Sequence, residues 1–171
     1  MKNILIVYKS ETGFTEKYAK WLSSELSCDM IKLKDASLDK ISDYHILIYG
    51  AGLYAGKING FEEFEKIVPS DKKLVLFATG ATDMNDSDTI QRAFDSNLSK
   101  EKQESIPHFY ALGGLDYDNM CFKHKVMMKG LLMMLKKKNP TAYNAISKSF
   151  DGCDFKYLSS LVDCVKSMIE E

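Results

Sequence analysis

The sequence predicts an α/β fold in which one doubly wound, parallel sheet is covered by helices on both faces. Two observations lead to this prediction. Short apolar runs alternate along the chain with amphipathic stretches of helical period. The apolar runs are also nearly continuous, which is typical of strands that are buried on both faces. Right-handed crossovers between such strands wind a chain into a parallel sheet with a helix layer on each side.

The first strand and the first helix form the opening unit of this alternation. The run NILIVY predicts a buried strand over residues 3–8. Tyr18, Ala19 and Leu22 then recur at helical spacing, so they share one face of a helix predicted over residues 15–26.

The later elements repeat the same alternation. The runs HILIY, KLVLFA and PHFYAL have the length and the composition of strands, and helical periodicity returns between them. The later strands are predicted over residues 30–33, 45–49, 73–78 and 107–112. The later helices are predicted over residues 61–68, 87–98 and 157–169, with a further helical stretch that ends near residue 138.

Size and composition fit one globular domain. The chain has 171 residues, of which 45% are hydrophobic and 27% are charged, and this length supports one sizeable core. We expect a single domain over residues 1–171, because no internal repeat and no linker rich in Pro, Gly or Ser divides the sequence. The apolar run near the start is too short for a signal or membrane segment, so we expect a cytoplasmic protein.

Composition also argues against two kinds of site. The four cysteines are scattered without the spacing of metal ligands, and the three histidines share no local motif, so no metal site is predicted. A single arginine and the lack of any base-reading motif argue against nucleic acid as a partner. No convincing acid–base or nucleophilic group of side chains stands out, and no catalytic residue is predicted.

The loop after the first strand carries the strongest functional signal. Three hydroxyl residues surround a glycine where a helix begins, and a plain helix cap would explain only one of them. The free N–H groups of a first helical turn attract an anion, hydroxyls can donate to phosphate oxygens, and glycine lets the backbone close around the ligand. The run is Ser10, Glu11, Thr12, Gly13, Phe14 and Thr15.

This Ser-x-Thr-Gly-x-Thr pattern resembles the FMN phosphate loop of the flavodoxin family, in the same place relative to strand and helix. The resemblance implies a flavodoxin-like, five-stranded sheet of order 2-1-3-4-5 and FMN as the cofactor. It also implies that the phosphate is bound by Ser10, Thr12, Gly13 and Thr15, with the backbone of Glu11 and Phe14 contributing.

The resemblance implies two further walls of the flavin site. The loop after the third strand would lie against the isoalloxazine ring, with Tyr54 as the stacking aromatic. The loop after the fourth strand would bind the pyrimidine edge of the flavin through its backbone. No second aromatic lies between Phe77 and Phe94, so we expect a more open second flavin face. The implied cofactor contacts are Gly52, Leu53, Tyr54, Ala55 and Gly56, followed by Thr79, Gly80, Ala81, Thr82 and Asp83.

A basic, methionine-rich segment separates the fifth strand from the last helix. Residues 119–143 contain six lysines and no acidic residue, although the whole chain has a net charge of −1. The sequence predicts a helical insertion at about residues 115–139, capped by Asp118 or Asn119 and ended by Asn139 and Pro140. This insertion and the stretch Gly-Gly-Leu-Asp-Tyr before it resemble the short, flavodoxin-like protoporphyrinogen dehydrogenases.

Three functions remain open from the sequence. The first is an electron-transfer flavodoxin that docks on a redox partner protein through an acidic surface. The second is an FMN-dependent dehydrogenase or reductase acting on protoporphyrinogen or a quinone. Its small apolar or anionic redox substrate would bind in a site shaped by the insertion. The third is a non-redox binding module with the same fold. Methionines flanked by lysines also favour peripheral contact of residues 119–138 with a membrane.

Overall fold

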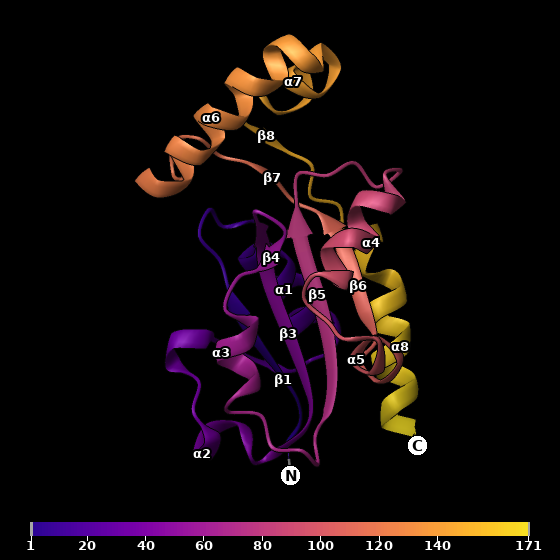
Figure 1. Ribbon diagram of the computed structural model, residues 1–171. Coiled ribbons are helices and arrows are strands. Elements are labelled where there is room, and N and C mark those ends of the chain that lie inside the picture. The colour runs from indigo at the N-terminus through magenta and orange to yellow at the C-terminus, as the bar shows by residue number, and fades with distance from the viewer. Residues whose placement is uncertain (1, 171) are drawn as a thin grey trace.

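The computed structural model describes residues 2–170 and contains a central sheet of five parallel strands (Figure 1). Their order across the sheet is β2-β1-β3-β5-β6, and the short strand β4 pairs antiparallel with β3 beyond this path. The predicted parallel α/β fold and its strand order are therefore confirmed. The strands are β1 (Lys2–Lys9), β2 (Asp29–Lys32), β3 (Tyr44–Tyr54), β4 (Lys57–Ile58), β5 (Lys73–Gly80) and β6 (His108–Leu112).

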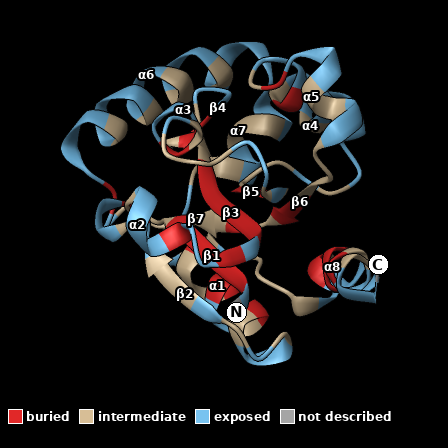
Figure 2. Ribbon diagram, turned by 90° about the horizontal axis from the view of Figure 1, so that it is seen from below, coloured by how far each residue is buried: buried red, intermediate tan, exposed pale blue. Residues whose placement is uncertain are grey.

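Alternate side chains of the central strands enter two different cores, one on each face of the sheet. In β1, Ile4, Ile6 and Tyr8 enter one core, whereas Leu5 and Val7 enter the other. Both faces are buried, which explains why the strands are apolar at almost every position (Figure 2). The first core is covered by α1 (Phe14–Glu25) and α8 (Ser159–Glu170), and the second by α2 (Leu38–Ile41), α3 (Phe61–Glu65) and α4 (Ser87–Asp95).

The third strand extends five residues further than predicted. It remains paired with β5 as far as Gly52, and it then reverses into β4. The reversal is made by Ala55 and Gly56, whose φ angles are 49° and 77°. Two consecutive positive φ angles are the geometry of a type I′ hairpin. The segment expected to be a glycine-rich loop is therefore a strand end and a tight turn.

Two predicted helices end early, and several one-turn elements were not predicted. Helix α3 stops three residues before its predicted end, where the chain approaches Pro69, because a residue before proline avoids helical conformation. Helix α4 also stops three residues early, and Asn97 beyond it binds the hairpin instead, accepting from Ile58 N and donating to Gly56 O. The additional elements include η1 (Leu33–Asp35), α2 and α5 (Lys100–Ser105).

The basic segment forms two helices that lie beyond the carboxyl ends of the parallel strands (Figure 1). They are α6 (Phe122–Lys138) and α7 (Pro140–Ile146). Two short strands that pair antiparallel, β7 (Gly114–Leu115) and β8 (Phe150–Asp151), precede and follow them in the chain. Asn139 ends α6 as predicted and caps α7, since its Oδ1 accepts a hydrogen bond from Ala142 N at 3.1 Å. The structure describes every residue of both helices, and none of their side chains is fully buried.

The predicted start of α6 is wrong. Cys121, not Asp118 or Asn119, occupies the N-cap position. The reason is a local turn in which the Asp116 carboxylate accepts hydrogen bonds from Asp118 N, Asn119 N and the Asn119 side chain. These backbone and side-chain groups are hydrogen-bonded within the turn, so they do not cap the helix that follows.

The chain returns to the sheet through η2 (Phe155–Leu158) and ends in α8. Tyr18 of α1, fully buried, fixes this return, because its hydroxyl donates to Leu112 O at 2.5 Å and accepts from Asp154 N at 3.1 Å. Within the described part of the chain, no helix has both the length and the apolar content needed to cross a bilayer.

Candidate functional site

A cavity of about 1220 Å³ opens at the carboxyl ends of β1, β3, β5 and β6. In a doubly wound parallel sheet, ligands bind at this edge. The structure brings the three predicted loops together here. All the residues predicted to bind the cofactor line this cavity except Gly13, which lines a smaller pocket beside it.

The first loop presents unpaired N–H groups at the start of α1. The first helical hydrogen bond is donated by Lys17 N to Gly13 O, so the preceding N–H groups of the first turn are directed outward from the helix end. Gly13 has a φ of 93°, and apart from its neighbours along the chain a Cβ added there would meet no described atom within 4 Å. Ser10 Oγ accepts a hydrogen bond from Gly13 N at 3.1 Å, which leaves its own hydrogen available. These features fit the phosphate group of FMN.

Thr15 connects the first loop to the fourth-strand loop. Its hydroxyl lies 2.7 Å from the hydroxyl of Thr79, and both side chains are buried. Either hydroxyl can donate, so the pair leaves one hydrogen for a further acceptor. The predicted phosphate contact of Thr15 and the predicted flavin contact of Thr79 are therefore coupled through one hydrogen bond.

Tyr54, the predicted stacking aromatic, already stacks on another ring. Its ring lies 4.3 Å from the imidazole of His124, with an angle of 10° between the planes. Burial raises the pKa of Tyr54 to about 12, and the charge of Glu11 acts in the same direction, against a hydrogen bond with Thr12. One face of Tyr54 is thus covered by α6, which the sequence did not predict.

The third predicted wall is held in place by Tyr110. Its buried hydroxyl donates to Thr82 O at 2.9 Å and accepts from Thr82 N at 3.0 Å. Burial raises the pKa of Tyr110 to about 12, so this hydroxyl stays protonated at neutral pH. Because the N–H of Thr82 is engaged within the protein, it is not a free donor for the pyrimidine edge of a flavin.

The far side of the cavity is formed by the insertion. Methionine, leucine and isoleucine side chains of α6 and α7 face the strand ends, in place of the second aromatic that the sequence lacks. An aliphatic roof therefore lies over this side of the cavity. The roof residues are Met127, Met128, Leu131, Ala142, Ala145 and Ile146.

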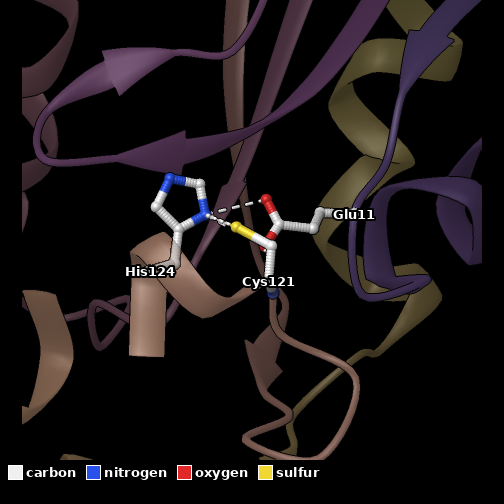
Figure 3. A group of neighbouring side chains, drawn as sticks. All are labelled: Glu11, Cys121 and His124. Atoms are coloured by element: carbon white, nitrogen blue, oxygen red, sulfur yellow. Dashed lines mark hydrogen bonds and ion pairs between the residues drawn. The ribbon is translucent and has the colours of Figure 1, made fainter. Parts of the chain in front are cut away.

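Three side chains meet where α6 begins, beside the first loop (Figure 3). His124 Nδ1 lies 2.9 and 2.8 Å from the two carboxylate oxygens of Glu11, and 3.4 Å from Cys121 Sγ. Cys121 N also donates to Glu11 Oε1 at 2.8 Å. Burial acts to raise the pKa of Glu11, but the hydrogen bonds from Cys121 and His124 outweigh it and lower this pKa.

Sequence reasoning missed this cluster. Glu11 appeared only as a backbone contact to phosphate, and its carboxylate turns toward α6 instead. Cys121 and His124 are three residues apart, whereas Glu11 is more than one hundred residues away in the chain. The one available signal was the Cys-x-x-His spacing, which alone is too common to predict a site.

Comparison with known proteins gives one family and one partial relative. The profile of the flavodoxin domain matches residues 5–142. An uncharacterized protein of Methanocaldococcus jannaschii is 37% identical over 78 residues, which cover 44% of this chain and 52% of the relative. The chain therefore spans about half the length of the curated relative that it matches.

Solved structures resemble this chain at low sequence identity. An NADH:FMN oxidoreductase in its apo form is 17% identical with a TM-score of 0.50, covering 66% of this chain and 76% of its own. Reduced Megasphaera elsdenii flavodoxin is 18% identical with a TM-score of 0.44, covering 70% of this chain and 89% of its own. The domain match spans most of the chain, including all three loops of the cavity. The chain belongs to the flavodoxin family, and its cofactor is FMN.

Proposed function

We propose that this redox flavoprotein is an FMN-dependent oxidoreductase that exchanges electrons with a small, flat, uncharged reactant such as a quinone. The observation that carries the proposal is the roofed cavity. Its volume of about 1220 Å³ exceeds the roughly 300–1000 Å³ of ordinary small-molecule pockets. FMN supplies the redox chemistry when bound. The excess volume leaves room for a second reactant between the strand ends and the insertion.

The residues of the chain divide into three tasks in this proposal. The first loop and the start of α1 bind the phosphate and fix the position of the cofactor. The hairpin and the Thr82 loop orient its ring system, and the latter is held rigid by Tyr110. The aliphatic side chains of Met128 and Leu131 cover the reactant and exclude water from it.

The charges around the cavity favour an uncharged reactant over a porphyrinogen. Four acidic side chains line it, whereas Arg92 is the single lysine or arginine among the lining residues that the structure describes. A porphyrinogen bears carboxylates, which like charges repel. The resemblance to protoporphyrinogen dehydrogenases therefore supports the reaction class better than this substrate. The acidic residues are Glu11, Asp83, Asp86 and Asp116.

Polar substitutions in the roof test this proposal. We expect Met128→Gln combined with Leu131→Asn to raise the half-saturating quinone concentration about thirtyfold, because each change removes roughly 1 kcal/mol of apolar burial. The measurement is anaerobic reoxidation of the reduced protein by a water-soluble quinone, followed through flavin absorbance. Met133→Gln is the matched control, since Met133 is 69% exposed on the same helix.

A second candidate function is electron transfer to a protein partner. The acidic residues at the cavity mouth favour it, because they would attract a basic redox protein. In that case the roof variants would exchange electrons with quinone at the rate of the unaltered protein. Electron exchange with a basic protein acceptor would be faster than with quinone, and its rate would fall steeply as the salt concentration rises. A preference for protoporphyrinogen over quinone would contradict the charge argument.

We also propose that the outer surface of α6 contacts anionic lipid, from which an apolar reactant could enter the cavity. Apolar side chains are exposed along this helix, with Phe122 at 82% and Val126 at 55%. They alternate with exposed lysines, and no acidic residue interrupts them. Basic helices with exposed apolar side chains bind at the lipid interface without crossing it.

Charge reversal on α6 tests the lipid contact. Lys136→Glu combined with Lys137→Glu is expected to weaken binding to phosphatidylglycerol vesicles by about 2 kcal/mol, roughly thirtyfold, at low salt. Lys34→Glu combined with Lys66→Glu makes the same change in net charge outside α6 and is expected to have little effect. The measurement is co-sedimentation with vesicles, and equal losses in both variants would show that only net charge matters.

A further inference from the structure

The Glu11–Cys121–His124 cluster directs three kinds of metal-ligating atom at one point (Figure 3). The imidazole nitrogen, the thiol sulfur and a carboxylate oxygen all lie within 4.8 Å of one another. Thiolate, imidazole and carboxylate are the ligands that zinc and similar divalent ions prefer in proteins. Residues from two distant parts of the chain supply them, so the fold itself assembles the group.

The geometry differs from that of a nucleophilic triad. In a triad, the carboxylate and the nucleophile bind opposite nitrogens of the imidazole. Here Glu11 and Cys121 both approach the same nitrogen, Nδ1 of His124. The thiol and the carboxylate are therefore grouped around a single ring nitrogen, where one ion can contact all three groups.

Neighbouring contacts already fix the orientation of the ligands. The ring of His124 is stacked on Tyr54 at 4.3 Å. The Glu11 carboxylate is fixed through Oε1, which accepts a hydrogen bond from Cys121 N at 2.8 Å and leaves Oε2 for an ion. Such supporting contacts are typical of metal sites, where they hold each ligand in one rotamer.

We propose that Glu11, Cys121 and His124 form a binding site for a divalent transition metal of the zinc type. With bond lengths of about 2.0–2.3 Å, the ligand atoms of a tetrahedral zinc ion lie roughly 3.3–3.6 Å apart. Here Nδ1 lies 3.4 Å from Sγ and 2.8 Å from Oε2. The Nδ1–Sγ pair already has this spacing, the Nδ1–Oε2 pair needs to widen by about half an ångström, and Sγ lies within 4.8 Å of the carboxylate oxygen. The imidazole binds as the tautomer with its proton on Nε2, and the thiol proton passes to solvent.

The ion would connect the insertion, which forms the roof of the cavity, to the phosphate loop. Glu11 belongs to the phosphate loop, whereas Cys121 and His124 open α6. Because α6 has no fully buried side chain, this cluster is a principal link between the roof and the first loop. Three protein ligands leave a fourth position for water. The site goes beyond the proposed redox function and does not depend on the identity of the reactant.

The test is metal binding by the intact protein with FMN bound. Zn²⁺ affinity is measured by competition with a chromogenic chelator, and Co²⁺ is used as a spectroscopic probe of the ligands. We expect one Zn²⁺ per chain, and Co²⁺ absorption with a thiolate charge-transfer band and tetrahedral ligand-field bands. Cys121→Ser, Glu11→Gln and His124→Phe are each expected to lower Zn²⁺ affinity by more than about 100-fold.

Matched variants keep the test specific. His124→Phe retains an aromatic ring to stack on Tyr54 but removes the ligand atom. Cys164→Ser and His45→Asn change the same residue types elsewhere and are expected to leave Zn²⁺ affinity unchanged. Cys121→Ser is expected to retain bound FMN, so loss of metal and loss of flavin can be told apart.

Two results would overturn the proposal. One is no Zn²⁺ binding by the unaltered protein, which would make the cluster a set of hydrogen bonds. The other is Zn²⁺ binding that survives all three ligand substitutions, which would place the ion elsewhere. Hydrogen exchange in α6 gives a further readout, because added Zn²⁺ should slow it in the unaltered protein and not in Cys121→Ser.

Discussion

A Thr12→Val variant is expected to bind FMN about 1–3 kcal/mol more weakly, roughly 5- to 150-fold in Kd, while its affinity for riboflavin stays unchanged. The reason is that Thr12 lies in the phosphate loop, where its hydroxyl would donate a charge-assisted hydrogen bond to a phosphate oxygen. Riboflavin lacks the phosphate and so does not report this bond. Titration of the apoprotein with each ligand, followed by flavin fluorescence, gives both affinities.

The control for this experiment lies in the same cavity. Thr141 is on α7 and lines the cavity on its roof side, away from the phosphate loop. Thr141→Val is therefore expected to leave both affinities unchanged. An equal loss for FMN and riboflavin in Thr12→Val would mean that Thr12 acts through its contact with Tyr54 and not through phosphate.

The sequence was sufficient to predict the sheet because its strands are buried on both faces. Side chains such as Ile6 and Val7 enter opposite cores, so both alternating sets of positions in the run are apolar. A continuous apolar run of this length is readily identified as a buried strand. The strand order came from the resemblance carried by the phosphate loop. The resemblance also implied which three loops meet at the cavity, and the parallel strands all end at that edge of the sheet.

Other features depend on contacts that no local pattern encodes. The end of β3 was misplaced because its last residues are paired with β5 and then with β4, which no local pattern shows. The start of α6 was misplaced because the Asp116 turn removes the expected cap. The cover on Tyr54 and the Glu11 cluster both arise because the insertion folds back over the sheet. These are tertiary contacts of His124 with residues far away in the chain, Tyr54 and Glu11.

Gly50 shows how a residue expected in a loop has a packing role inside a strand. The third strand was predicted to end at residue 49, which placed Gly50 at the start of the loop expected to lie against the flavin. In the structure it lies inside β3, directly opposite Phe77 of β5 in the register of the parallel pair. A Cβ at this position would overlap with the ring of Phe77. The glycine is therefore required because the ring lies across the backbone of the neighbouring strand.

The Gly50→Ala variant is accordingly expected to lose about 3 kcal/mol of folding free energy, at the upper end of the range for overpacked cores. Phe77 is fully buried within the core under α1 and α8, so its ring cannot move aside without displacing other core residues. Urea unfolding of the two proteins, with FMN absent to remove any effect of ligand binding, measures the difference.

A second substitution distinguishes this collision from a general loss of strand flexibility. Phe77→Leu shortens the side chain and should relieve the overlap, so the double variant is expected to lose less stability than the sum of the two single changes. If the two losses simply add, the overlap is not the cause, and the requirement for glycine would lie in the backbone of β3. The φ of Gly50 is not in the left-handed region, whereas those of Gly13, Gly56 and Gly60 are. A backbone requirement is therefore disfavoured at Gly50, and the collision with Phe77 is the cause that we expect the experiment to find.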